Sequence, residues 1–334
     1  MITLSEVPSN AINVANTVYV MKNGNDSTGL VQRFDKPFLT INAAINAADT
    51  YFTSRTNEDR IKIIVYNGIY DEEVTLKNFI DLDLNDCTLI NDSGGNYSAI
   101  IKDNAQTFSK VSVNDVNVYI TGNANLITYS THTDIQYPLQ LNGNGTFIIT
   151  LNSIISNVGE CVLCDGNPDK ILKIYFNKFY CYNSTDFNLI QPIHILMNTS
   201  YDFQGKYEFI GGTIEARDTP NLKVTILATF PNTSVSINKY CDIILNNCLI
   251  IGNSNTMPTI CTLGENSNEI SGNIRLYLLS TRIWNKYSVD SISALGVGSN
   301  ILLYNYNSYS NYNANINVSQ QVNSLGVNSN ITPI

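Results

Sequence analysis

Charged residues are scarce in this chain of 334 residues, and positive charge is the scarcer sign. Only 14% of the residues are charged, with 19 Lys and Arg against 28 Asp and Glu, which gives a net charge of −9. The sequence contains no cluster of Lys or Arg. Because nucleic-acid binding depends on basic side chains that displace counterions from phosphates, the composition argues against a nucleic acid as partner.

Long apolar runs are also missing. No stretch of the sequence is long enough to span a bilayer, so no membrane insertion is predicted. The first residues, Met1–Pro8, lack a basic segment followed by an apolar run, and no secretory signal is expected. A protein without such a signal that acts outside a cell could be released by lysis, as part of a virus particle.

Metal-ligating residues are few and badly spaced. The chain has two His and seven Cys, and an odd number of Cys does not indicate a disulfide framework. Cys161 and Cys164 form a CxxC motif, but no second pair stands at metal-ligand spacing and neither His132 nor His194 is close in sequence. Since structural zinc needs four ligands, we expect no metal and no cofactor, and buried thiols in a protein assembled under reducing conditions.

Asparagine is abundant, whereas helix-forming stretches are nearly absent after position 55. The chain contains 48 Asn, 20 Tyr and 19 Gly. Asn tolerates left-handed turn conformations and can stack its amide in ladders, so this bias favours many strands joined by many turns. The composition therefore predicts an all-β protein.

An alternating apolar segment that ends in a small polar residue recurs along the chain. Anchored on that turn residue, the copies are spaced by 25 to 36 residues. One copy per coil of a solenoid, with loops of variable length, explains both the repeat and its irregularity. The anchors are Asn85, Thr121, Asn152, Asn177, Gly211, Asn246, Ser280 and Asn305.

Alternate side chains of a strand share a face, so the repeat also predicts orientation. Ile80, Leu82 and Leu84 should point inward, and Asp81 and Asp83 outward. Two residues after the anchor, an inward stack is expected from Cys87, Ile154, Phe179 and Cys248. The anchors Asn85, Asn152, Asn177 and Asn246 should form a ladder at one corner.

A single short helix is predicted near the N-terminus. Thr40 is a suitable N-cap, and the apolar residues that follow it recur at i, i+3, i+4 and i+7. A strand at 18–20 precedes this helix and strands at 61–70 and 73–76 follow it, so the helix should act as a lid over the open end of a β-structure. The apolar face consists of Ile41, Ala44, Ile45 and Ala48.

This strand, polar turn and capped helix, contained in residues 17–70, resembles the beginning of pectate-lyase-like right-handed parallel β-helix proteins, especially those of phage tailspikes and other virion appendages. The resemblance implies a right-handed, single-stranded parallel β-helix with an N-terminal α-helical cap. It further implies a homotrimer, contacts with other virion proteins, a role in contacting host surface polysaccharide, and location in the virion after assembly in the host cytoplasm.

No composition shift or Pro/Ser-rich linker divides the chain. We expect residues 1–16 to be a lead-in or attachment segment and residues 17–285 to be the capped β-helix. Residues 286–334, rich in Asn, Ser and Tyr, should be a terminal region that closes the last coil or packs against a neighbouring subunit.

Outward charged residues in neighbouring repeats are the candidate catalytic groups. With the anchors aligned, Asp81, Lys173, Glu208 and Asp242 come within one position of each other. Paired carboxylates can act as acid and base or nucleophile in glycoside hydrolysis, and a Lys can act as base in β-elimination. A solvated strand face carries charges anyway, so alternation alone also explains these residues.

Aromatic side chains offer a second route to glycans, because flat rings stack on sugar faces. The candidates are Trp284, which is outward if Ile283 is inward, together with Tyr304 and Tyr306 in a Tyr-rich run. Protein interfaces prefer the same residue types, and the sequence does not separate the two roles.

Three functions remain open. The favoured one is a non-enzymatic structural or receptor-binding appendage of a virus particle. The resemblance to phage tailspikes favours a phage as that virus. The alternatives are a polysaccharide depolymerase, either lyase or glycoside hydrolase, that acts through outward carboxylates, and a bacterial surface adhesin with the same fold. Fold alone does not establish an activity.

Overall fold

The structure, a computed structural model, describes residues 15–90, 99–102, 116–128, 137–156, 161–165, 169–182, 192–196, 203–216, 225–230, 240–254, 259–264, 273–287, 292–294, 301–310 and 318–320. Within these ranges the chain forms 28 strands and one helix. The strand pairs described are all parallel.

The strands form three sheets, here called A, B and C. Sheet A contains β1 (Thr17–Val20), β2 (Ile61–Val65), β5 (Ile80–Leu84), β8 (Val118–Gly122), β11 (Gly145–Thr150), β14 (Lys170–Tyr175), β17 (Phe203–Ile210), β20 (Tyr240–Asn246), β23 (Asn273–Leu279), β26 (Ile301–Tyr306) and β28 (Val318–Gln320). Sheet B contains β3 (Gly68–Asp71), β6 (Cys87–Ile90), β9 (Asn125–Thr128), β12 (Ser153–Ser156), β15 (Lys178–Cys181), β18 (Thr213–Ala216), β21 (Leu249–Gly252), β24 (Arg282–Asn285) and β27 (Tyr309–Ser310). Sheet C contains β4 (Val74–Thr75), β7 (Ile100–Lys102), β10 (Leu139–Leu141), β13 (Val162–Asp165), β16 (Ile193–Leu196), β19 (Ile226–Phe230), β22 (Ile260–Gly264) and β25 (Ile292–Ala294).

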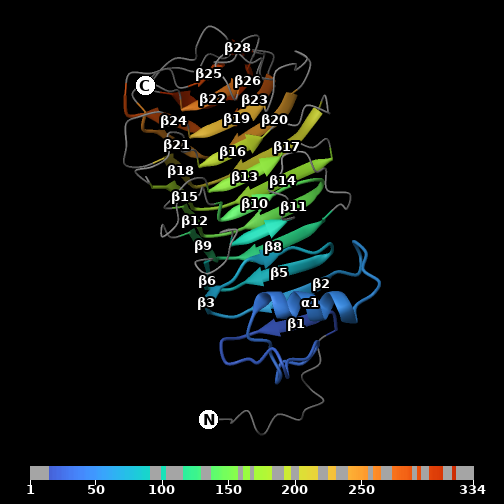
Figure 1. The fold of residues 1–334 in the computed structure, drawn as a ribbon. Coiled ribbons are helices and arrows are strands. Elements are labelled where there is room, and N and C mark those ends of the chain that lie inside the picture. Colours follow the sequence, from blue (N-terminus) through green and yellow to red (C-terminus); the bar gives the residue numbers. More distant parts are fainter. Residues whose placement is uncertain are drawn as a thin grey trace.

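From β2 to β27 the chain visits sheets A, B and C in turn, and each strand pairs with the strand of the same sheet one coil later. Figure 1 shows the result as strands stacked along one axis from β1 to β28. This all-β arrangement of long parallel sheets is the architecture of a parallel β-helix. The sequence repeat therefore predicted both the fold class and one repeat per coil.

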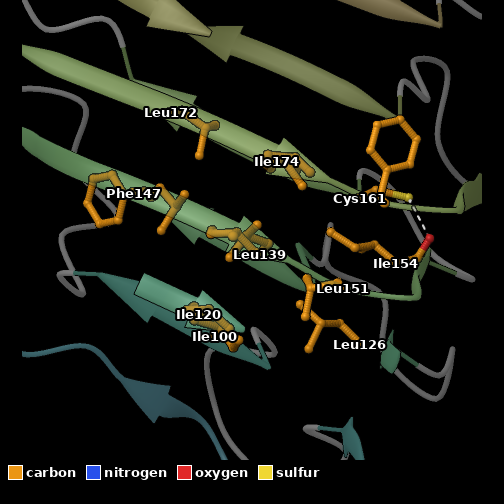
Figure 2. Close-up of a cluster of buried hydrophobic side chains, with 14 of the residues drawn as sticks. Ile100, Ile120, Leu126, Leu139, Phe147, Leu151, Ile154, Cys161, Leu172 and Ile174 are labelled. Carbon is orange, nitrogen blue, oxygen red and sulfur yellow. Dashed lines mark hydrogen bonds between the residues drawn. The ribbon is translucent and has the colours of Figure 1, made fainter. Parts of the chain in front are cut away.

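The core lies between the three sheets, where every second side chain points inward. Ile80, Leu82 and Leu84 are buried as predicted, and Asp81 and Asp83 between them stay partly accessible. Figure 2 shows inward side chains from all three sheets converging, including Ile120 from sheet A, Leu126 from sheet B and Leu139 from sheet C. The stacking of like residues along the axis buries one continuous apolar core.

The corner between sheets A and B carries an Asn ladder that is shorter than predicted. The Asn152 amide donates to Asn125 at 2.8 Å, and the Asn177 amide donates to Asn152 at 3.0 Å. Asn246 is not part of the ladder because it is the last residue of β20 and pairs with Ile210. Asn85 donates instead to Asp83 of its own strand. Only two of the four predicted residues therefore belong to the ladder.

The predicted inward stack is also divided between two positions. Ile154 lies opposite Phe179, and Phe179 lies opposite Ile214 of the next coil. Cys87 and Cys248 are buried, as expected, but each stands two residues earlier in its coil, directly before Thr88 and Leu249 at the turn from sheet A. Cys87 is displaced because the turn after β5 is two residues longer than the turn after β11. Cys248 is displaced because its anchor, Asn246, aligns with Tyr175 and so stands two residues before the position of Asn177.

Helix α1 (Ile41–Tyr51) forms where the sequence predicted it. Thr40 is its N-cap and accepts from the Ala43 amide, and the side chains buried beneath the helix are Ile41, Ala44, Ile45 and Ala48. The Glu72 carboxylate accepts from the amides of Ile41 at 2.8 Å and Asn42 at 2.9 Å. A carboxylate at this end satisfies free amides and complements the positive end of the helix dipole.

The boundaries of the predicted segments remain predictions. Residues 1–14 of the lead-in lie outside the described residues. Within 286–334, strands β25 to β28 continue the same three sheets. The described part of this terminal region thus belongs to the stack.

Candidate functional site

The outer face of sheet A carries the four predicted charged residues, but the strand register separates them. Lys173 of β14 lies directly opposite Glu208 of β17. Asp242 of β20 lies opposite Lys206, two residues before Glu208. This corrects the alignment made from turn residues: Ile210, and not Gly211, pairs with Asn246.

Asp81 stands apart from the other three. It is opposite Lys62 on β2, and β8 and β11 lie between its strand and that of Lys173. At the usual spacing of strands, three steps along the sheet amount to about 14 Å. The four residues therefore do not converge on one point of the surface.

Asp81 is held by Arg60, which precedes β2. The guanidinium donates from Nε at 2.7 Å and from an Nη at 2.5 Å to the two carboxylate oxygens, and the Tyr119 amide donates to the same carboxylate at 2.8 Å. Arg60 also lies over the Tyr119 ring, 4.1 Å from its centroid. A two-bond Arg pair with an added amide donor engages both carboxylate oxygens, so Asp81 is arranged as a structural anion.

The Lys173–Glu208 pair is looser, with 3.5 Å between the amine and the carboxylate. The hydrogen bond with Tyr175, reinforced by the charge of Glu208 and opposed by partial desolvation, raises the pKa of Lys173. A raised pKa keeps the amine protonated at neutral pH. Lys173 in this arrangement is therefore a poor general base for β-elimination.

Asp242 repeats the arrangement of Asp81 at the other end of the sheet. Arg275 of β23 donates to both oxygens of its carboxylate, at 2.5 Å and 2.8 Å. The guanidinium lies 4.1 Å from the centroid of the Tyr240 ring and 5.9 Å from that of Phe203. Each of the three predicted acids is thus paired with a cation, and no two of them face each other as hydrolysis by paired carboxylates requires.

Beside this pair, aromatic rings cover the outer face of the last coils. Tyr277 and Tyr304 stack with centroids 4.5 Å apart and an interplanar angle of 9°. Tyr306 is outward on the same strand as Tyr304 and is half-buried. We define the aromatic patch of sheet A as Phe203, Tyr240, Arg275, Tyr277, Tyr304 and Tyr306.

Trp284 lies on a different face from the tyrosines. It is on β24 of sheet B, 49% exposed, and Ile283 before it is buried, so the predicted outward orientation is confirmed. The residue next to it in sheet B is Ile251, and the one beyond is Glu215. The Glu215 carboxylate, largely buried, pairs with Lys286 at 3.1 Å.

Sequence reasoning missed the cations that hold the carboxylates. Arg60 precedes the first repeat, so no alignment of repeats could have placed it beside Asp81. Arg275 stands five residues before its anchor Ser280, and Asp242 stands four residues before Asn246. Only the sheet register shows that the two residues are nevertheless directly opposite each other. The available sequence signal for such ion pairs was the presence of opposite charges near equivalent positions of neighbouring repeats.

In the described part of the chain, no three His, Cys, Asp or Glu residues are grouped so that they could hold a metal ion. Cys161 and Cys164 are three residues apart in extended chain, which places them about 10 Å from each other. The Cys161 sulfur instead lies 3.4 Å from that of Cys181. Among the described residues, six cysteines are buried: Cys87, Cys161, Cys164, Cys181, Cys241 and Cys248.

Comparisons with known proteins leave the chain without an assigned family. No family model matches it, and neither a curated protein nor a solved structure does. Among the described residues, no helix has the length and apolar character needed to cross a membrane.

Proposed function

We propose that this chain is a non-enzymatic appendage protein of a virus particle that contacts host surface glycans through the outer face of sheet A. The observation that supports this function over catalysis is the pairing of Asp81, Glu208 and Asp242 with Arg60, Lys173 and Arg275. Each of these three carboxylates is engaged by a cation, and no two of the three face each other as acid and base would.

The aromatic patch of sheet A supplies the surface for a glycan in this proposal. Its rings stand beside a guanidinium that is still 29% accessible, so ring stacking on a sugar face and hydrogen bonding to sugar hydroxyls are available side by side. A parallel β-helix suits such a role because its outer faces are long and rigid.

The proposal also includes the handedness of the coil and the role of helix α1 as a cap. A right-handed coil is expected because parallel strands are connected by right-handed crossovers in nearly all sheets. We assign helix α1 the role of a cap, since its buried face contacts β1, β2, β4 and β5 at the first coils. Residues before the helix support this role: Gln32 and Phe38 donate to carbonyls of the edge strand β1 and cover that edge.

Binding to immobilised bacterial capsular and lipopolysaccharide glycans tests the proposal. Tyr304→Ala and Tyr306→Ala should each weaken binding about tenfold, which corresponds to ~1.4 kcal/mol. Tyr51→Ala, at an exposed aromatic residue on helix α1, is the matched control and should bind like the wild type.

The same glycans, incubated with the protein, should yield neither new reducing ends nor unsaturated products. Product formation that Asp242→Asn abolishes would replace the proposal with the depolymerase alternative. Detection of the chain in purified virus particles supports the appendage role. Its absence from them, together with a location on a bacterial surface, would favour the adhesin.

A further inference from the structure

Two buried cysteines meet inside the coil, where sheet B gives way to sheet C. Cys161 directly precedes β13 of sheet C, and Cys181 is the last residue of β15 of sheet B. Their sulfur atoms are 3.4 Å apart, and both side chains are fully buried. To reach the length of a disulfide bond, the two sulfurs have to approach each other by about 1.4 Å. A shift of this size is on the scale of side-chain rotation.

The sheet register holds the backbone of both residues. The Cys161 amide donates to the Pro192 carbonyl at 3.1 Å. Cys181 lies opposite Ser156 of the preceding coil and Ala216 of the following coil. The contact between the two sulfurs therefore depends on strand pairing in sheets B and C.

One coil combines these two cysteines. In the adjacent coils, the equivalent positions hold Pro138 and Pro192 next to Cys161, and Ser156 and Ala216 next to Cys181. Cys164, the other member of the CxxC motif, lies about 10 Å from Cys161 along extended chain. It cannot take the place of Cys181 without backbone movement, because disulfide geometry demands close approach.

The hydrogen bonds of the Cys161 thiol are weak. Its sulfur lies 3.5 Å from the Ile154 carbonyl, as the dashed line in Figure 2 shows, and 3.3 Å from the Tyr180 carbonyl. A thiol has a single proton and is a poor donor. Replacing these contacts by a covalent bond to Cys181 therefore gives up little.

We propose that Cys161 and Cys181 are a cross-linking site, which closes one coil into a covalent ring under oxidising conditions. The ring contains β13, β14 and β15, one strand from each sheet. It stabilises the fold because it restricts the unfolded chain. A reducing cytoplasm keeps the two thiols apart as thiols, and transfer to oxidising surroundings forms the bond.

The oxidant in this proposal is a small-molecule disulfide such as oxidised glutathione. One cysteine attacks it as a thiolate, forms a mixed disulfide and releases the first small thiol. The other cysteine attacks the mixed disulfide at the protein sulfur and releases the second small thiol. Two protein thiols are oxidised to one disulfide, one small disulfide is reduced, and the two protons end on the released thiols.

Peptide mapping of the full chain tests the cross-link. The protein is incubated with oxidised glutathione in urea below its unfolding midpoint, because buried sulfurs react only when the coils open locally. It is then alkylated in full denaturant and digested. We expect a 161–181 disulfide within one chain. Its absence, or a 161–164 disulfide in its place, would overturn the proposal.

Cys161→Ser is the disrupting variant, because a Ser hydroxyl can still donate to the carbonyls of Ile154 and Tyr180. Cys164→Ser is the matched control, since it removes another buried thiol from the same segment. Oxidation should raise the thermal midpoint of the wild type and of Cys164→Ser by about 5 °C, and that of Cys161→Ser not at all.

An equal shift in Cys161→Ser would assign the stabilisation to another site and contradict the proposal. If Cys161→Ser does not fold, Cys181→Ala answers the same question. The cross-link lies in the core and glycan binding uses the outer face of sheet A, so either proposal can fail alone.

Discussion

Arg275 and Asp242 lie opposite each other on neighbouring strands of sheet A, and the guanidinium donates one hydrogen bond to each carboxylate oxygen. The Asp242 side chain is only 14% accessible, and the Arg275 side chain 29%. The pair therefore lies on the outer face but is partly withdrawn from water, and its guanidinium lies over the rings of Tyr240 and Phe203.

This geometry predicts a specific order of stabilities. Arg275→Met leaves the Asp242 carboxylate without its partner and should lower the free energy of unfolding by about 1–3 kcal/mol. The double variant Arg275→Met/Asp242→Leu removes both charges and should recover part of that loss. Urea midpoints measure the order, and a double variant less stable than Arg275→Met would contradict the pairing.

Helix α1 should depend on its buried face. Ile45→Ala removes a fully buried side chain beneath the helix and should cost about 2–5 kcal/mol. Tyr51→Ala, at an exposed position of the same helix, should change the thermal midpoint little. Equal midpoint shifts for the two variants would show that the helix does not pack as described.

The buried thiols should be unreactive in the folded protein. Burial raises the pKa of Cys87 and of Cys248 to about 12, so at pH 8 roughly one thiol in ten thousand is the reactive thiolate. Iodoacetamide should label neither residue before unfolding and both after addition of denaturant, as peptide mass spectrometry can determine. Rapid labelling of native Cys248 would place this residue outside the core.

Stability near helix α1 should depend on pH through Glu72. Burial raises the pKa of this carboxyl above its usual 4.5, although the amides of Asn42 and Ile41 partly oppose the shift. Between pH 4.5 and the folded-state pKa, the folded protein therefore holds a proton that the unfolded chain has released. Stability from this group is fully present below pH 4.5 and is lost as the pH rises through the folded-state pKa.

Glu72→Gln is the comparison that isolates this effect, because Gln keeps a carbonyl acceptor and does not titrate. The thermal midpoint of the wild type minus that of Glu72→Gln should decrease as the pH is raised across this window. A difference that stays constant, or that increases with pH, would contradict the raised pKa.

The candidate site was predictable in its residue types but not in its geometry. Asp81 and Trp284 point outward as alternation required, since side chains of a strand must alternate. The cations that pair with Asp81 and Asp242 could not be predicted from the sequence, because Arg60 is 21 residues from Asp81 and Arg275 is 33 residues from Asp242. The spacing predicted a group of candidate catalytic residues, whereas the structure places Asp81, Glu208 and Asp242 in separate ion pairs.

The sequence by itself determined the repeat, the inward and outward residues, and the helix over 41–48 with its cap at Thr40. These are local properties, since strand alternation and helical periodicity depend on neighbours in the chain. Only the tertiary structure decided the register, which puts Lys173 opposite Glu208 and removes Asn246 from the corner ladder. Register depends on the length of each turn and loop between coils, and a difference of one residue there moves every outward side chain relative to its neighbours.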